Sequence, residues 1–241
     1  MSTLTYLAFH ARFVVPALIA LAAVARCRRP ESVDVRVHGV GVGVLLALAV
    51  VYTTPWDATL IERGVWWYGD GRVTGWVFGV PVGEFLFFVL QPLLTSLWTL
   101  QVAGPVVEGV SHSRRDRLVG AAAGLAVNLA GFAALTGTST MYLGAILAWA
   151  GPILALQWAV GWRYLLRVRR RVVLAVGVPT VYLWVADWYA IADGVWVISG
   201  THTTGLAVAG LPVEEMAFFL VTNLFVVQGL VLFRWVVSRW R

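Results

Sequence analysis

Long runs of apolar residues, separated by short polar stretches, make up most of this 241-residue chain. A helix that crosses a membrane needs about 20 mostly apolar residues. Seven segments meet this requirement, at about residues 4–25, 37–56, 78–103, 118–136, 141–161, 172–191 and 207–233. The remaining stretches are too short for a separate soluble domain, and the first segment lacks a small-residue cleavage site. The pattern predicts an all-α transmembrane protein of seven helices, the first of them permanent.

The composition supports this class, because 60% of the residues are hydrophobic and the mean hydropathy is +0.81, well outside the range of soluble domains. All 18 basic side chains are arginines, and fifteen lie on one side of the predicted membrane. The positive-inside rule then predicts a multi-pass protein of the cell membrane, with its N-terminus outside and its C-terminus cytoplasmic. The net charge of +6 is thus explained by the membrane topology and by attraction to anionic lipid headgroups. It does not indicate that the protein binds nucleic acid. The fifteen are Arg26, Arg28, Arg29, Arg36, Arg114, Arg115, Arg117, Arg163, Arg167, Arg169, Arg170, Arg171, Arg234, Arg239 and Arg241.

The sequence also repeats itself. Residues 57–75 match residues 187–205 at a shift of 130, and one residue later "GVPVGEFLFF" lies on "GLPVEEMAFF" at a shift of 131. Upstream, Tyr6-Leu7 and Pro16 match Tyr142-Leu143 and Pro152 at a shift of 136. These matches predict two three-helix units of parallel topology, residues 1–105 and 140–241, joined by a linking helix within residues 106–139. Binding sites in such proteins tend to form where the two repeats meet.

Four acidic residues occupy repeated positions near one end of the predicted helices: Asp57 with Asp187, and Glu84 with Glu215. Carboxyl groups inside a membrane are rare, usually face the protein interior and indicate function. For the two glutamates, which lie a turn or two inside the helices, we favour a functional role. For the two aspartates, helix capping or pairing with Arg63 and Arg72 explains the sequence equally well.

Aromatic residues accompany the acids. Each repeated glutamate is followed three and four residues later by a phenylalanine pair, which shares its helix face: Phe87 and Phe88, then Phe218 and Phe219. Apolar surroundings favour the protonated form of a carboxyl group, and aromatic faces can stabilise a cation. A phenylalanine pair alone would indicate packing, but here the whole Pro-x-x-Glu-x-x-Phe-Phe unit occurs twice. It therefore predicts a proton donor to a hydrocarbon.

Tryptophans are frequent in the two predicted outer loops, each about 20 residues long and long enough to cover the site as a lid. Most fit an aromatic belt at the membrane surface. Trp66 and Trp196 occupy equivalent positions in the repeat, so they are candidates for lining a pocket. Trp56 directly precedes a repeated acid.

Several other chemistries are disfavoured. The chain has no lysine, so a retinal Schiff base is excluded. The "GVGVG" at residues 39–43 lies inside a predicted span and indicates helix packing, not a dinucleotide site. The four histidines lack metal-ligand spacing. We therefore expect neither a cofactor nor a metal.

The motifs "TPWD", "PVGEFLFF" and "PVEEMAFF" resemble those of the integral-membrane lycopene cyclases, and the resemblance extends over essentially the whole chain. That family is cofactor-independent and occurs as paired three-span subunits, as a fused chain or within a bifunctional protein. The resemblance implies that lycopene ends are closed to β-ionone rings, giving γ-carotene and β-carotene. Members often carry both acids in each half, whereas here Gly83 stands opposite Glu214.

The resemblance also implies roles for the acids. Glu215 would be the general acid, with Glu214 or Glu84 as its partner. Asp57 and Asp187 would orient this pair or relay protons, and the phenylalanines would stabilise the cation. The resemblance does not fix which group removes the last proton from the ring. The carboxylate that remains after the general acid has given up its proton would serve as this base.

Other functions stay open on sequence grounds. A cyclase or hydratase of longer carotenoids, or a cyclase that sets another double-bond position, would need the same acid. A proton-coupled transporter would use the acids as a relay, and a non-catalytic carotenoid-binding protein would need only the aromatic groove. The expected partners are a lipid-soluble carotenoid and membrane lipid, with other carotenoid-pathway enzymes as candidates.

Overall fold

A computed structural model describes residues 4–28 and 33–240. Within these residues seven helices are long and apolar enough to cross a membrane, which confirms the predicted all-α transmembrane class. The first consists of α1 (Tyr6–Phe9), a π-helical turn (His10–Val14) and α2 (Val15–Cys27). The others are α3 (Val35–Glu62), α4 (Val82–Val102), α5 (Arg114–Ala134), α6 (Met141–Arg167, after a 3₁₀ turn at Thr138–Thr140), α7 (Arg169–Asp193) and α8 (Val213–Ser238).

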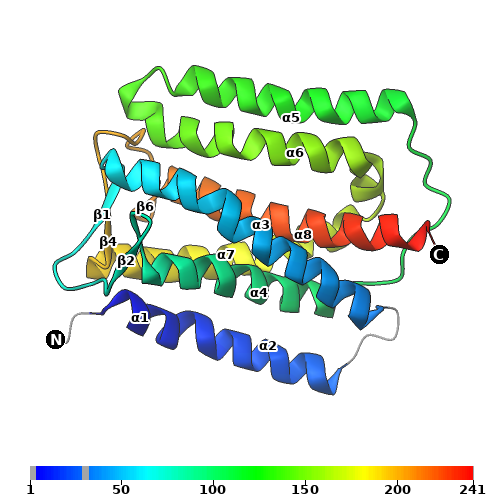
Figure 1. Cartoon of the computed structure of the whole chain (residues 1–241), viewed down its shortest axis with the longest axis horizontal. Coiled ribbons are helices and arrows are strands. Elements are labelled where there is room, and N and C mark those ends of the chain that lie inside the picture. The colour runs from blue at the N-terminus through cyan, green and yellow to red at the C-terminus, as the bar shows by residue number, and fades with distance from the viewer. Residues whose placement is uncertain (1–3, 29–32, 241) are drawn as a thin grey trace.

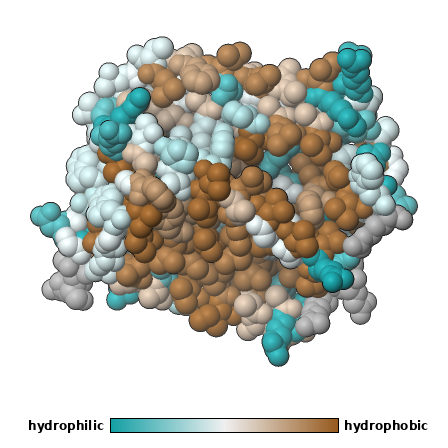
Figure 2. Space-filling view, in the orientation of Figure 1, coloured by the Kyte–Doolittle hydropathy of each residue, from teal (hydrophilic) through white to brown (hydrophobic). Residues whose placement is uncertain are grey.

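The helices lie side by side along roughly one axis, so the bundle has two distinct ends (Figure 1). At one end, here called the strand end, the six short strands of the described chain lie between the helices. At the other, here called the arginine end, lie the described members of the predicted cytoplasmic arginine group; Arg29 and Arg241 of that group fall outside the described residues. Hydrophobic side chains cover the middle of the face seen in Figure 2, and the most hydrophilic residues lie toward its edges. This surface suits a chain surrounded by lipid.

Helix α5 lies on the outside of the bundle and packs mainly against α6. A side-chain carbon added at Gly124 would come within 2.2 Å of the Ala155 backbone nitrogen, so the two helix backbones touch at a position that only glycine fits.

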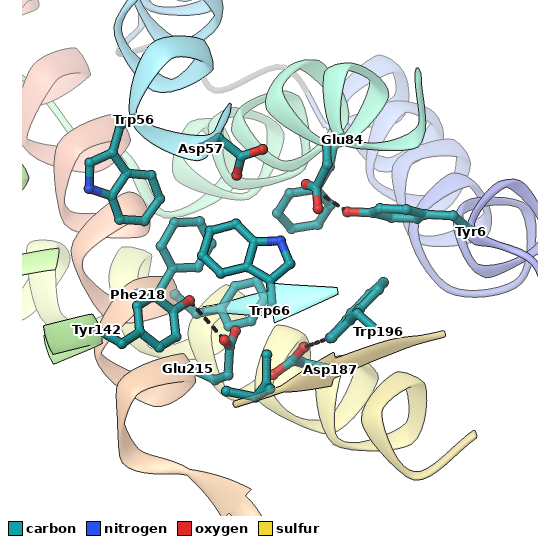
Figure 3. A pocket seen from close by; sticks show the side chains of 13 residues that line it. Tyr6, Trp56, Asp57, Trp66, Glu84, Tyr142, Asp187, Trp196, Glu215 and Phe218 are labelled. Atoms are coloured by element: carbon teal, nitrogen blue, oxygen red, sulfur yellow. Dashed lines mark hydrogen bonds between the residues drawn. The ribbon is translucent and has the colours of Figure 1, made fainter. Parts of the chain in front are cut away.

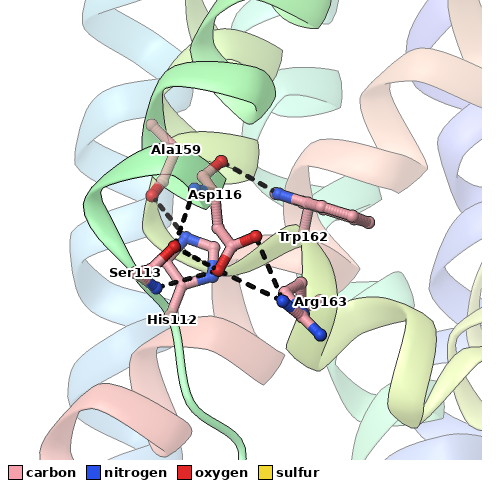
Figure 4. A network of polar contacts seen from close by, with 6 residues as sticks. All are labelled: His112, Ser113, Asp116, Ala159, Trp162 and Arg163. Atoms are coloured by element: carbon pink, nitrogen blue, oxygen red, sulfur yellow. Dashed lines mark hydrogen bonds and ion pairs between the residues drawn. The ribbon is translucent and has the colours of Figure 1, made fainter.

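The start of α5 is fastened by a polar network (Figure 4). Ser113 and Asp116 form a capping box, Arg163 donates to the Asp116 carboxylate at 3.2 Å, and the Trp162 indole donates to the Asp116 backbone oxygen at 2.9 Å. His112 contacts the backbone oxygen of Ala159 at 2.9 Å. Asp116 is thus an acid with a structural role and a full set of partners.

The loops at the strand end form three antiparallel pairs in the described chain. Strand β1 (Trp66–Tyr68) pairs with β4 (Trp196–Ile198). Strand β2 (Trp76–Val77) forms a hairpin with β3 (Val80–Pro81), and β5 (Ala207–Val208) forms one with β6 (Leu211–Pro212). The β1–β4 pair joins loops that belong to opposite halves of the chain.

The two hairpins shift two helix starts from their predicted positions. The spans expected from residues 78 and 207 begin at Val82 and Val213. Both hairpin tips, Phe78-Gly79 and Ala209-Gly210, have positive φ at both positions, as a two-residue type I′ turn requires. Hydropathy alone does not detect this reversal, because the turn residues are themselves apolar.

A polar cluster lies deep between α4, α7 and α8. The Asn223 side chain accepts a hydrogen bond from Gln91 at 2.8 Å and one from Thr95 at 2.5 Å, and it donates to Thr180 at 3.0 Å. All four side chains are buried, so the cluster ties three helices together where water does not compete. We refer to it below as the Asn223 clasp.

Candidate active site

One pocket at the strand end collects most of the predicted site residues (Figure 3). Helices α3, α4, α7 and α8 each contribute one acid: Asp57, Glu84, Asp187 and Glu215. The lining contains no basic side chain among the described residues. The remaining lining residues are Tyr6, Trp56, Trp66, Phe87, Tyr142, Trp196, Ile198, Phe218 and Phe219.

In the described structure the two aspartates are neither helix caps nor members of an ion pair. Asp57 and Asp187 lie one to two turns inside the ends of α3 and α7 and are only 3% and 1% exposed. Arg72 pairs instead with Asp193. Asp187 accepts a hydrogen bond from the Trp196 indole at 2.9 Å, and one carboxylate oxygen of each aspartate is buried without a hydrogen-bond partner in the described structure.

Glu84 accepts hydrogen bonds from two tyrosine hydroxyl groups. Tyr6 donates to Oε2 at 2.9 Å and Tyr68 donates to Oε1 at 2.6 Å. The Trp66 indole in turn donates to the Tyr68 hydroxyl oxygen at 3.2 Å. Burial, reinforced by the negative charge of Glu84, raises the pKa of Tyr68 far above its ordinary value, so Tyr68 keeps its proton and remains a donor.

Glu215 has a sparser environment on the opposite side of the pocket (Figure 3). Its Oε1 contacts the Tyr142 hydroxyl at 2.8 Å. Tyr6 and Tyr142 occupy matching positions in the sequence repeat, so each glutamate meets the tyrosine of its own half. The matched Tyr-Leu pairs carry this signal in the sequence, but their pattern does not indicate that the tyrosines contact the acids.

Aromatic rings form the walls between the acids. Trp56 stacks on Phe218 with ring centroids 5.8 Å apart and planes 2° from parallel. Phe87 meets Phe219 edge-to-face at 5.9 Å. Trp66 and Trp196 line the pocket and do not belong to a surface belt. Aromatic faces of this kind are able to stabilise a cation.

Two predicted site residues lie outside the lining. Glu214 is fully buried, and its Oε1 accepts hydrogen bonds from the backbone N–H and the hydroxyl of Thr204, both at 2.7 Å. Phe88 is buried against Phe85, with ring centroids 5.8 Å apart. Neighbouring helix positions point in different directions, so Glu214 turns toward the loop while Glu215 enters the pocket.

The cavity itself is small, about 50 Å³. That space holds a few water molecules, so a hydrocarbon end enters only when lining side chains move apart. The described residues contain no group of three or more His, Cys, Asp or Glu side chains placed to hold a metal ion.

The fold and the pocket together define a multi-pass membrane protein with an acid-lined, aromatic site. The sequence profile described as "Lycopene cyclase" matches residues 5–100 and 139–233. The chain therefore belongs to the lycopene cyclase family.

Its relatives include single-function and larger proteins. It is 53% identical to the lycopene beta-cyclase of Halobacterium salinarum, over 99% of this chain and all of that protein. It is 33% identical to the bifunctional lycopene cyclase/phytoene synthase of Neurospora crassa and 31% identical to that of Podospora anserina, over 95% of this chain. It spans 39% and 40% of those two proteins. No solved structure matches.

Proposed function

We propose that this protein is a lycopene beta-cyclase, which closes the linear ends of lycopene to β-ionone rings and yields γ-carotene and β-carotene. The observation that carries the proposal is the convergence of four carboxyl groups, from four helices, on one aromatic pocket. The 53% identity to a lycopene beta-cyclase supports the substrate.

The reaction is an acid-catalysed isomerisation. In our proposal Glu215 donates a proton to the terminal double bond, forming a C–H bond and a tertiary cation. The next double bond attacks this cation and closes the ring, and loss of a ring proton restores neutrality. Proton gain and loss balance, so no redox cofactor takes part. Two carboxyl groups in one apolar pocket do not both ionise cheaply, so one retains the proton that the first step needs.

The other lining residues support this chemistry in the same proposal. Glu84 is the acidic partner of Glu215, because Glu214 is directed at Thr204. Asp57 and Asp187 orient the glutamates and relay protons between them. Phe87, Phe218 and Phe219, together with the pocket tryptophans, stabilise the cation through their ring faces.

We also propose the overall organisation predicted from the sequence. The two separate blocks matched by the family profile, 5–100 and 139–233, support units at residues 1–105 and 140–241 joined by a linker at 106–139. The arginine end is assigned to the cytoplasm and the strand end to the outside of the cell membrane.

The test uses a bacterium engineered to accumulate lycopene. Wild type, Glu215→Gln and the control Asp116→Asn are expressed to equal membrane levels, and the pigments are separated chromatographically. We expect ringed carotenes from the wild type and the control, and at least about a hundredfold less from Glu215→Gln, since a positioned acid contributes about 10²–10⁴ in rate. Unchanged lycopene with the wild type refutes the activity; full activity of Glu215→Gln refutes the role of the acid.

A further inference from the structure

The two glutamates of the pocket occupy equivalent places in the repeat but have unequal surroundings. Each is contacted by the tyrosine from the first helix of its own unit, Tyr6 or Tyr142. Among the described residues, only Glu84 accepts a hydrogen bond from a second hydroxyl group, that of Tyr68. The repeat places Ile198 where the first unit has Tyr68, and Ile198 lines the same pocket without a hydroxyl to offer. The asymmetry between the units thus depends on one side chain.

The direction of the hydrogen bond from Tyr68 is fixed by its other neighbour. An indole N–H only donates, so the Trp66 indole occupies an oxygen lone pair of Tyr68, and the Tyr68 hydrogen points to Glu84 Oε1 at 2.6 Å. In a chain of this kind each bond polarises the next. Hydrogen bonds donated to a carboxylate stabilise its ionised form. In the described structure no donor precedes the hydrogen bond from Tyr142 to Glu215, so the Tyr142 hydroxyl can reverse its role and accept a hydrogen bond from protonated Glu215.

We infer that Glu84 is held as the carboxylate and removes the ring proton in the last step, and that Tyr68 is the positioning residue that confers this role. The inference rests on the proposed cyclase function. It separates the base from the acid, since Glu215 donates the first proton and a different side chain receives the last one.

The proton balance closes within the pocket. Glu215 loses a proton as the terminal C–H bond forms, and Glu84 gains one as a ring C–H bond breaks. The proton then returns from Glu84 to Glu215 across the pocket that both line together with Asp57. No oxidant, reductant or metal is consumed.

The position of the base then decides the ring type. After ring closure, the cationic carbon has neighbouring carbons that carry hydrogen, and loss of a proton from each gives a different double-bond position. A base held by two tyrosines reaches one of these hydrogens selectively. A base that is displaced or neutralised leaves the cation to lose another proton or to be captured by water.

The experiment compares Tyr68→Phe with Tyr142→Phe, since each removes one hydroxyl beside a pocket glutamate. Both are expressed in lycopene-accumulating cells, and ring types are assigned by chromatography and NMR. For Tyr68→Phe we expect lycopene to be consumed at a rate within about tenfold of wild type, while a clear share of the ends carries another double-bond position or a hydroxyl. For Tyr142→Phe we expect slower consumption with wild-type ring type. Trp66→Phe should shift the ring type in the same way as Tyr68→Phe, but less.

Two results would overturn the inference and leave the proposed function standing. One is a wild-type ring composition from Tyr68→Phe, and the other is an altered ring type from Tyr142→Phe. If Tyr68→Phe fails to accumulate in the membrane, Glu84→Gln, which keeps the side-chain size, decides instead. Continued lycopene consumption with altered ends supports the inference, and complete loss of consumption, as expected for Glu215→Gln, overturns it. A wild type that leaves lycopene unchanged overturns the proposed function, and the inference with it.

Discussion

Asp187 and Asp193 lie six residues apart near the end of α7, yet their surroundings differ completely. Asp193 forms a salt bridge with Arg72 at 2.7 Å and accepts the Leu4 backbone N–H at 3.0 Å. Asp187 is 1% exposed, accepts one indole N–H, and has a second oxygen without a hydrogen-bond partner in the described chain. One helix thus carries a structural acid at the rim of the molecule and a pocket acid two turns further in.

This difference separates two uses of a carboxyl group in one fold. Asp116 at the arginine end and Asp193 at the strand end each have an arginine and a backbone N–H as partners. In the described part of the chain, the four pocket acids have hydrogen-bond partners only among tyrosine and tryptophan side chains, or have none. Buried polar groups without partners reduce stability and are rare in native proteins, so where they cluster a function is the usual explanation.

The strongest way to test this comparison within the pocket is to replace Asp57 and Asp187 separately by asparagine. Asparagine keeps the volume but removes the ionisable proton. Asp57 lines the same pocket as both glutamates, and its buried Oδ2 has no hydrogen-bond partner in the described structure, so we expect Asp57→Asn to lower the cyclisation rate roughly tenfold or more. Asp187→Asn keeps an acceptor for Trp196, and roughly a threefold loss is expected. Initial rates of lycopene loss in isolated membranes measure both, and a larger effect of Asp187→Asn would contradict the assignment.

A smaller effect on activity, and a larger one on stability, is expected from Arg72→Ala. Arg72 donates to the backbone oxygens of Leu4 and Asp193 as well as to the Asp193 carboxylate. Its loss leaves Asp193 without its cation and loosens the start of α1. We expect the midpoint of thermal unfolding in detergent to fall by a few degrees, with ring type unchanged. Altered ring type together with an unchanged midpoint would place Arg72 in the site instead.

The smallest effect is expected from Asp116→Ala, which removes one side of the capping box and the contact with Arg163. The unfolding midpoint should fall by only about a degree or two, and the rate per molecule should equal that of wild type. Circular dichroism melts and pigment conversion check these values. A loss of activity per folded molecule would mean that the arginine end is coupled to the pocket.

Much of the fold follows from hydropathy, because each span is a long apolar segment and lipid permits little besides helices. Hydropathy did not predict that helices α4 and α8 start at Val82 and Val213, because the hairpins before them are as apolar as the helices. The pairing of β1 with β4 was also beyond the sequence pattern. It joins segments about 130 residues apart, and such contacts depend on how the helices bring the loops together.

The candidate site was predicted in part. The repeat singled out Glu84 and Glu215 and thereby selected two residues that face one pocket. It left Glu214 open as the partner of Glu215, because rotation about the α8 axis decides which of two adjacent side chains turns inward. It also did not indicate Tyr68, since its contact with Glu84 requires the fold of the loop, and its counterpart Ile198 hid it from the repeat.

The Asn223 clasp and the β1–β4 pair have a mechanical consequence. The clasp joins Gln91 and Thr95 of α4 to Thr180 of α7 and Asn223 of α8, while the strand pair joins the loops of the two halves. Rocking of one half against the other, as in alternating-access carriers built from repeats, would break both fastenings at once. These two fastenings hold the halves in one arrangement, so the side chains that line the pocket, and not the two halves, are the parts that move to admit a substrate.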